Sequence, residues 1–308
     1  MARQRPRSRG SSLWLFLLGL LVGAGALYLF LQRTSPHPER EGAPAAREKR
    51  PEEKSARRRA RASDHVEPES HTAVTVPPPA AGPVHGVRVA LVIDDLGRSV
   101  EDLPALEGLG VPVSYAVLPY QEQTPQVVSE LRERGAEILL HLPMEPKNGE
   151  DPGPGALRRG MSDDELREKT LAALRAVPGA VGVNNHMGSG FSAEQGPMTT
   201  VLGVLAARGL FFLDSRTSAE SVGYRVAREL GVPAAERQVF LDGEPTPEAI
   251  EIQFQRLLGL ARAHGSAIAI GHPHPETLAA LEREVPKAKA DGYEFVPVSY
   301  LLDRSSDE

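Results

Sequence analysis

The sequence has 308 residues, a formal net charge of −6, 41% hydrophobic residues and no cysteine. Its acidic balance argues against a nucleic-acid partner, and the absence of cysteine excludes disulfides, thiolate metal sites and a cysteine nucleophile. Any metal site must therefore use His, Asp or Glu side chains.

The amino-terminal residues predict a membrane anchor. A basic tail (1–12) precedes an uncharged apolar run (13–31), which at about 1.5 Å per residue matches the hydrocarbon thickness of a bilayer. The run continues beyond its small residues at 23–26, so we interpret it as a signal anchor that is retained. The arginines in the tail favour an amino terminus inside the cytoplasm and a catalytic domain in the periplasm or otherwise outside the cytoplasm.

The next segment (32–85) predicts a disordered linker. It is rich in Pro, Ala and charged residues and has very few large apolar side chains. Such a composition buries too little apolar surface to offset the entropy of ordering the chain. We therefore expect the globular domain to span residues 86–303, followed by a short tail (304–308).

From residue 87 onward, apolar β-type runs alternate with amphipathic segments. Strands are expected at 87–93, 111–119, 137–143, 180–187, 209–215, 237–242, 266–273 and, finally, 293–298. Helices are expected at 99–109, 124–134, 162–177, 199–208, 221–230, 246–264 and from 275 onward. Ser162 and Glu165 have the spacing of a capping box, and Thr246 precedes a proline that suits the first turn of a helix. This strict alternation predicts a parallel α/β sheet.

Polar residues occur at the carboxyl end of almost every expected strand. They are Asp94 and Asp95, His141, Asn184 with Asn185 and His186, Asp214 and Ser215, Asp242, and His272 with His274. The carboxyl ends of barrel strands meet at one mouth, where barrel enzymes place their catalytic residues. An open sheet would gather such residues only at its switch point. No Gly-x-Gly-x-x-Gly turn follows the first strand, which disfavours a dinucleotide fold. We therefore expect an α/β barrel of the TIM-like type.

The same residues indicate a metal-dependent acid–base site. Side chains of adjacent residues in a strand point to different sides, so one of Asp94 and Asp95 could bind a metal while the other takes a proton. His141 could be an enclosed core residue, but beside His186 and an aspartate it is interpreted as a ligand. Two imidazoles, one carboxylate and an open position are typical of catalytic Zn²⁺.

The remaining strand-end residues receive supporting assignments. His272 is the expected proton donor, because it lies nearer the strand end than His274. Asp214 could orient a base or cap the next helix, and Ser215 and Asn185 are candidates for contacts around the site. Asp242 is interpreted as structural, since it opens a turn.

Six sequence blocks resemble the divergent polysaccharide deacetylase family. The blocks are ALVIDDLG (90–97), AVLPY (116–120), EILLHLPMEP (137–146), VGVNNHMGS (181–189), FFLDSRT (211–217) and IAIGHPHPETL (268–278). The broader relatives are the NodB-type carbohydrate esterases, which have a distorted (β/α)7 barrel and remove acetyl groups from sugars with a divalent metal.

The resemblance implies a role for individual residues. Asp94 matches the general base, Asp95 a metal ligand, His141 the first metal-binding histidine and His272 the general acid. The esterases carry a second histidine four residues after the first, where this chain has Glu145. Either Glu145 or His186 would then supply the third ligand, and we favour His186. The arginine motif that orients the base in the esterases has no clear equivalent here.

Together these observations predict a membrane-anchored hydrolase that uses a divalent metal, with Zn²⁺ preferred. Its expected substrate is a cell-envelope polysaccharide or peptidoglycan, from which it would remove acetyl groups, and its anchor in the inner membrane would be residues 13–31. The alternative is a catalytically inactive barrel that serves as a glycan-binding or regulatory protein.

Overall fold

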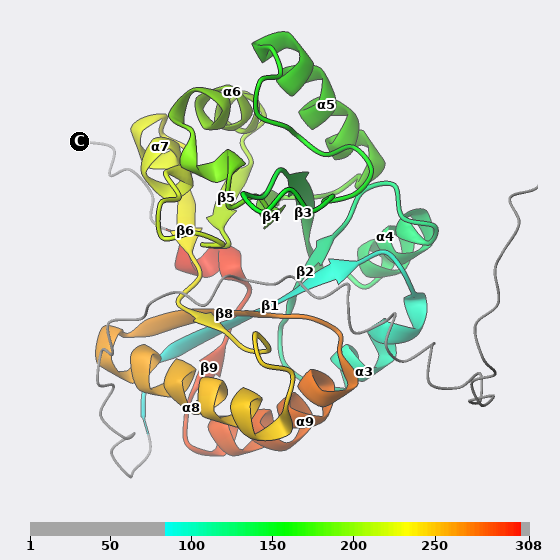
Figure 1. Cartoon of the computed structure of the whole chain (residues 1–308). Coiled ribbons are helices and arrows are strands. Elements are labelled where there is room, and N and C mark those ends of the chain that lie inside the picture. Colours follow the sequence, from blue (N-terminus) through cyan, green and yellow to red (C-terminus); the bar gives the residue numbers. More distant parts are fainter. Residues whose placement is uncertain (1–83, 303–308) are drawn as a thin grey trace, which may run out of the picture. The chain divides into compact units, whose positions relative to one another are not determined.

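The computed structural model describes residues 84–302, which form one α/β unit (Figure 1). Its strands are β1 (Arg88–Leu96), β2 (Ser114–Val117), β3 (Glu137–Met144), β4 (Gly182–Met187), β5 (Phe211–Asp214), β6 (Ala234–Glu236), β7 (Val239–Phe240), β8 (Ser266–Gly271) and β9 (Glu294–Phe295). Its α-helices are α3 (Leu103–Gly108), α4 (Thr124–Glu133), α5 (Asp163–Ala176), α6 (Gln195–Ala206), α7 (Gly223–Glu229), α8 (Pro247–His264) and α9 (Pro275–Ala290). Short 3₁₀ helices are η1 (Val100–Asp102), η2 (Phe191–Ala193) and η3 (Val298–Leu301).

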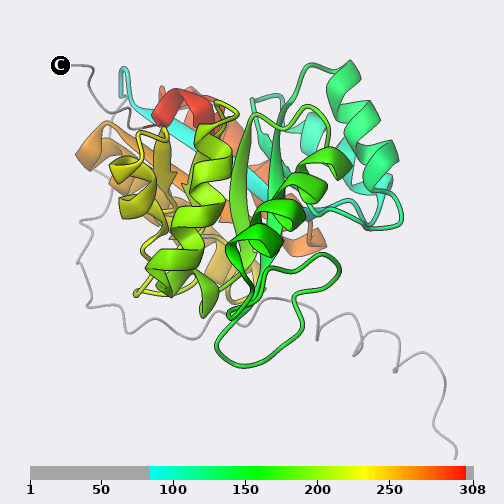
Figure 2. The ribbon, with the colours of Figure 1, turned by 90° about the horizontal axis from the view of Figure 1, so that it is seen from above.

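The strands form a curved parallel sheet with the order β6-β5-β4-β3-β2-β1-β8-β7, and β9 pairs with β1. Every strand pair is parallel. The helices lie around the outside of the sheet, as Figures 1 and 2 show from two directions. Parallel strands require such crossover connections, and the helices cover the convex face of the sheet.

Strands β6 and β7 are the two edge strands of the sheet, and two residues (237–238) connect them in the chain. The Arg237 amide donates to the carbonyl of Asp214 on the β5 side (3.0 Å), and the Gln238 amide donates to the carbonyl of Ile268 on the β8 side (3.0 Å). The pairing path is therefore open between β6 and β7, and the fold is a parallel-strand half-barrel. The expected parallel α/β arrangement is confirmed, but the predicted single strand at 237–242 is wrong. The chain instead switches partners at residues 237–238 and forms two shorter strands.

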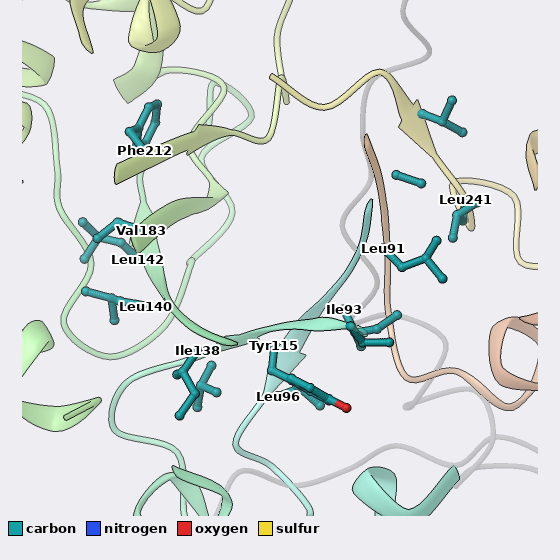
Figure 3. Close-up of a cluster of buried hydrophobic side chains, with 14 of the residues drawn as sticks. Leu91, Ile93, Leu96, Tyr115, Ile138, Leu140, Leu142, Val183, Phe212 and Leu241 are labelled. Carbon is teal, nitrogen blue, oxygen red and sulfur yellow. The ribbon is translucent and has the colours of Figure 1, made fainter. Parts of the chain in front are cut away.

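Two apolar layers hold the sheet in place. One layer lies between the strands and the helices, and Figure 3 shows part of it, including Leu91, Ile93, Leu140 and Phe212. The other lines the concave face and contains the alternate strand residues, together with Val298 of η3. Because successive residues of a strand point to opposite faces, strands buried on both sides appear in the sequence as continuous apolar runs.

The helix starts follow the capping signals in the sequence. The Ser162 hydroxyl accepts from the Glu165 amide, and the Glu165 carboxylate accepts from the Ser162 amide, which confirms the capping box. The Thr246 hydroxyl accepts from the Ala249 amide at the start of α8. Helix α6 begins at Gln195, four residues before its expected start. The prediction missed this start because no side chain caps the helix there.

The predicted anchor (13–31), most of the predicted linker and the tail at 304–308 lie outside the described residues. Within residues 84–302, none of the helices combines the length and the apolar character needed to span a bilayer. The domain boundaries at 86 and 303 stay predictions.

Gly182 provides a test of the packing at the start of β4. A Cβ atom at this position would collide with the ring of Phe211 on β5, which is buried. Gly182→Ala should therefore lower the free energy of unfolding by about 1–3 kcal/mol, as overpacked cores do. Urea denaturation of the full chain measures this.

The matched control is Gly203→Ala on α6, where a Cβ atom meets nothing within 4 Å. An alanine in a helix is favoured over glycine by about 0.5–1 kcal/mol, so this variant should be slightly more stable than the parent. Equal effects of the two substitutions would contradict the close contact between Gly182 and Phe211.

Candidate metal and acid–base site

Strand alternation brings four polar side chains to the concave face at the carboxyl ends of the strands. The residues two positions before Asp94 and His141 both belong to the concave-face core, so these two side chains point the same way. On β4, Val183 packs toward the helices, so its neighbour Asn184 and then His186 face the concave side. All four polar side chains are buried.

A bulge at the end of β1 adds Asp95 to this group. The β1–β2 register runs from Ile93 opposite Tyr115 to Leu96 opposite Val117, so β1 contains one extra residue. Asp95 has a φ of 61°, in the left-handed region that aspartate enters more readily than most residues. The bulge turns its side chain toward the site, as bulges next to active sites often do.

As a result, both carboxylates reach the same histidine. Asp94 Oδ2 lies 3.5 Å and Asp95 Oδ1 lies 3.4 Å from His141 Nε2. The expectation that Asp94 and Asp95 point to different sides is therefore wrong. It assumed regular strand geometry, which the bulge interrupts.

Asp95, His141 and His186 form a triangle of potential metal ligands. His186 Nδ1 lies 3.0 Å from Asp95 Oδ1 and 3.1 Å from His141 Nε2. Asp95 Oδ1 is buried and has no hydrogen bond of acceptable geometry, although both imidazoles adjoin it. The two imidazoles are thus hydrogen-bonded to each other, and the carboxylate oxygen beside them is the atom left without a hydrogen bond.

This donor set fits a divalent metal ion. Ligands bound at about 2.0–2.1 Å in a tetrahedral zinc site are about 3.3 Å apart, close to the sides of the observed triangle. Two nitrogen donors and one carboxylate oxygen are also the ligands that Zn²⁺ accepts. Asp95, His141 and His186 would therefore hold the ion, and a fourth position would remain for water or substrate.

Asn184 connects the triangle to Asp94. Its amide nitrogen donates to Asp94 Oδ1 (2.8 Å), so its amide oxygen faces His141 Nδ1 (2.9 Å) and accepts a hydrogen bond from the Nδ1–H group. With Nδ1 protonated, the lone pair of the neutral imidazole lies on Nε2, the atom that faces the triangle. Asn184 thus selects the tautomer of His141 that can bind a metal.

The two adjacent aspartates have opposite electrostatic environments. Burial raises the pKa of Asp94, and the nearby His141 and His272 offset only part of this effect. Burial also acts to raise the pKa of Asp95, but His186 and His141 outweigh it and hold that pKa well below its usual range. Asp94 is therefore suited to accept a proton and Asp95 to remain an ionised ligand.

A second buried pair lies at the end of β8. Asp242 Oδ1 lies 3.0 Å from His272 Nδ1, and Asp242 Oδ2 accepts from the His272 amide (2.6 Å) and from the Thr277 hydroxyl (2.8 Å). Burial acts to raise the pKa of Asp242, but His272 holds it below the usual value. Asp242, which was interpreted as structural, therefore also orients His272. His274 is half-buried and stacks on His272, with ring centroids 5.5 Å apart.

Three other predicted residues take positions beside this site. Ser215 Oγ accepts from the Asn184 amide (3.3 Å), so Ser215 contacts the site. Asn185 points away from it, where its oxygen accepts from the Ser215 amide (2.9 Å) and its nitrogen donates to the carbonyl of Met187 (2.8 Å). Asn185 thus braces the loop and does not join the triangle.

Asp214 and Glu145 take structural positions. Asp214 lies on the face opposite to Ser215 and accepts from the Ser221 hydroxyl (2.7 Å) and the Tyr224 amide (3.1 Å), which ties β5 to the start of α7. Glu145 pairs with Arg159 (2.9 Å) and is absent from the ligand triangle. Of the two alternatives for the third ligand, the structure brings only His186 to Asp95 and His141.

Two residues that the sequence did not single out complete the site. Asn184 was part of a strand-end cluster from which Asn185 was chosen, and Asp242 was assigned to a turn. Strand alternation could have found Asn184, because it lies two residues before His186 and so on the same face. The pairing of Asp242 with His272 joins different strands and had no local signal.

The chain is similar in sequence to known proteins. A family model described as "Divergent polysaccharide deacetylase" matches residues 91–302. An uncharacterized protein of Haemophilus influenzae is 37% identical over 142 residues, which cover 46% of this chain and 51% of that protein. The uncharacterized protein YibQ of Escherichia coli K12 is 38% identical over 148 residues, which cover 48% of this chain and 46% of that protein. The matched segments thus span about half the length of these curated relatives.

A solved structure extends the likeness to the fold. The crystal structure of an uncharacterized protein from Agrobacterium tumefaciens C58 is 30% identical, with a TM-score of 0.66. The match covers 73% of this chain and 93% of that one. The half-barrel is therefore shared with a relative of known structure.

The Asp242–His272 pair should make stability depend on pH. The folded-state pKa of Asp242 lies below its unfolded value, so its contribution is present above about pH 4 and is lost as the pH falls through the folded-state pKa. Asp242→Asn should lower the free energy of unfolding by about 2 kcal/mol at pH 7. The difference from the parent should shrink as the pH falls below about 4.

Urea denaturation of both proteins at several pH values measures this difference. Glu251→Gln, at an exposed position of α8, is the matched control and should change little at any pH. A constant loss for Asp242→Asn from pH 7 to pH 3 would contradict the assigned ionisation of Asp242.

Proposed function

Because the chain belongs to the divergent polysaccharide deacetylase family, we propose that it hydrolyses acetyl groups from a cell-envelope carbohydrate with the help of a divalent metal ion. The observation that carries this proposal is the convergence of an acid–base pair and a ligand triangle at one end of the sheet. The substrate would be a polysaccharide or peptidoglycan, with the acetyl group linked through nitrogen or oxygen.

The ligand set favours Zn²⁺ among the divalent ions. Bound by Asp95, His141 and His186, the ion would polarise the acetyl carbonyl and lower the pKa of a water molecule. The carboxylate of Asp95 would stay ionised, since the pKa of this buried group lies well below its usual range.

Asp94 is the proposed general base. It accepts a proton from the attacking water as the new carbon–oxygen bond forms. Its raised pKa makes the carboxylate a stronger base than an exposed aspartate. The Asn184 amide holds one carboxylate oxygen, so that Asp94 presents the other toward the ligand triangle.

His272 is the proposed general acid. Asp242 binds its Nδ1 atom and stabilises the protonated ring, so we assign proton donation to Nε2. The donated proton reaches the amine or alkoxide as its bond to the acetyl carbon breaks, and acetate leaves. The electrostatic effect of His272 on both Asp94 and Asp95 supports its position near the reacting groups.

We further propose that residues 13–31 anchor the protein in the cytoplasmic membrane and that the domain faces the periplasm. The apolar run and the basic tail before it support this arrangement. It would place the domain beside the glycans of the envelope.

Asp94→Asn tests the assignment of the base. Acetate release from acetylated peptidoglycan should fall by at least about 100-fold, because the amide cannot accept the proton. Zinc content, measured by elemental analysis after dialysis, should stay near that of the parent protein. Retained activity would contradict the role of Asp94. A parent protein that binds metal but releases no acetate would instead favour the glycan-binding or regulatory alternative.

Asn184→Ala tests the link between the tautomer of His141 and metal binding. Loss of a residue that orients a ligand should weaken zinc affinity by about 10–100-fold. Competition with a chromophoric chelator measures the dissociation constant. Asn185→Ala is the matched control on the opposite face, and it should reduce stability with little change in zinc affinity. Equal effects of the two substitutions on zinc affinity would contradict the role of Asn184.

A further inference from the structure

A groove outside the ligand triangle runs between helices α4 and α5. It encloses about 450 Å³ and is lined by Tyr120, Gln121, Thr124, Ser129, Arg132 and Arg175, together with small and apolar residues. None of its lining residues carries a carboxylate. The volume is comparable with that of ordinary ligand pockets.

Two arginines give the groove a positive charge. Arg132 near the end of α4 and Arg175 near the end of α5 are both exposed, and neither forms an ion pair within residues 84–302. The alkyl part of Arg132 packs against Gly179. A Cβ atom added at Gly179 would lie 3.2 Å from Arg132 Cδ. This contact positions one guanidinium at the edge of the groove, and the other lies across it on the neighbouring helix.

Tyr120 provides an aromatic surface at the opposite end. Its side chain is 44% exposed. Its backbone φ of 61° is unfavourable for a bulky residue. Its ring packs against Gly155, where a Cβ atom would collide with it. The structure therefore holds an exposed phenol ring in a strained position, an arrangement that occurs at ligand contacts.

The groove extends away from the catalytic end of the sheet. Tyr120 and Thr124 follow the carboxyl end of β2, the same end at which the ligand triangle lies. Arg132 and Arg175 lie near the carboxyl ends of their helices, which run back toward the opposite end of the sheet. Figure 1 shows α4 and α5 as neighbours on the outside of the sheet. A long ligand could contact Tyr120 first and the arginines farther along.

We propose that this groove is a secondary binding site for a carboxylate-bearing segment of the polysaccharide substrate, with Arg132 and Arg175 binding its carboxylates and Tyr120 contacting a sugar ring. This inference rests on the proposed function, because it assumes a polymeric glycan substrate. Guanidinium groups bind carboxylates in a planar, bidentate manner. The acidic character of the chain as a whole makes an anion-selective groove a local feature of this face.

Direct binding tests the groove. The probe is an oligomer of polygalacturonate, which carries one carboxylate per sugar, and its fully methyl-esterified form is the neutral control. Calorimetry with the full chain at low salt should give at least about tenfold weaker binding for the ester. Binding of the acidic oligomer should weaken as salt is added, because exposed charges are screened. Poly-L-glutamate, which has carboxylates but no sugar rings, should bind more weakly than the acidic oligomer.

Variants identify the residues involved. Arg132→Gln and Arg175→Gln should each weaken binding by about fivefold, the effect of losing one exposed ion pair, and the double variant by more than about tenfold. The matched control is Arg208→Gln. Arg208 is also exposed and lines a different groove, between α5 and α6. Its loss should leave binding unchanged, and thermal unfolding should show that all the variants remain folded.

Several results would overturn the proposal. They are no binding of the acidic oligomer, equal binding of its methyl ester or of poly-L-glutamate, an unchanged affinity in the double variant, and an equal loss with Arg208→Gln.

Failure of the proposed function has a different signature. The zinc-loaded parent would then release no acetate from acetylated peptidoglycan, while the binding differences among the variants would persist. If both hold, the double variant should raise KM for the acidic polymer and leave kcat unchanged.

Discussion

The arrangement of the site depends on one extra residue at the end of β1. In a regular strand, the side chains of Asp94 and Asp95 would point to opposite faces, and only one could enter the site. The bulge, with Asp95 in the left-handed region, brings both carboxylates next to His141. A residue other than glycine in this conformation costs about 1–2 kcal/mol. Strand β1 pairs with β2 on one side and with β8 on the other, and these pairings hold Asp95 in this conformation.

The bulge brings two carboxylates together in a buried place. Their lost hydration and mutual repulsion must be offset by nearby groups. Both carboxylates adjoin His141, at 3.5 Å from Asp94 and 3.4 Å from Asp95. Asp95 also adjoins His186 (3.0 Å), whereas Asp94 accepts a hydrogen bond from the neutral Asn184 amide. The pKa of Asp95 is therefore lowered and that of Asp94 is raised, although the two residues are adjacent. Such a separation of two neighbouring carboxylates is how one can act as a base while the other stays a ligand. The buried Asp242–His272 pair shares no residue with the triangle, and His272 nevertheless acts electrostatically on both Asp94 and Asp95.

Much of the fold was predictable because parallel strands that are covered on both faces leave continuous apolar runs in the sequence. The capping residues Ser162 and Thr246 marked two helix starts for an equally local reason. The two-residue link between β6 and β7 (237–238) was not predictable. It arises because the chain changes pairing partner from β5 to β8 within two residues, and neither partner is near in sequence.

For the site, the sequence by itself determined which chemical groups are available and at which end of the sheet they lie. Asp94, Asp95, His141, His186 and His272 all follow apolar strands, and parallel strands align their carboxyl ends. Only the tertiary structure decided which of these groups touch. The contact of Asp95 with two histidines depends on backbone geometry at one bulge, and the contacts of Asn184 and Asp242 join strands far apart in the chain. Local patterns record which way a side chain faces, whereas contacts between strands depend on how the sheet curves.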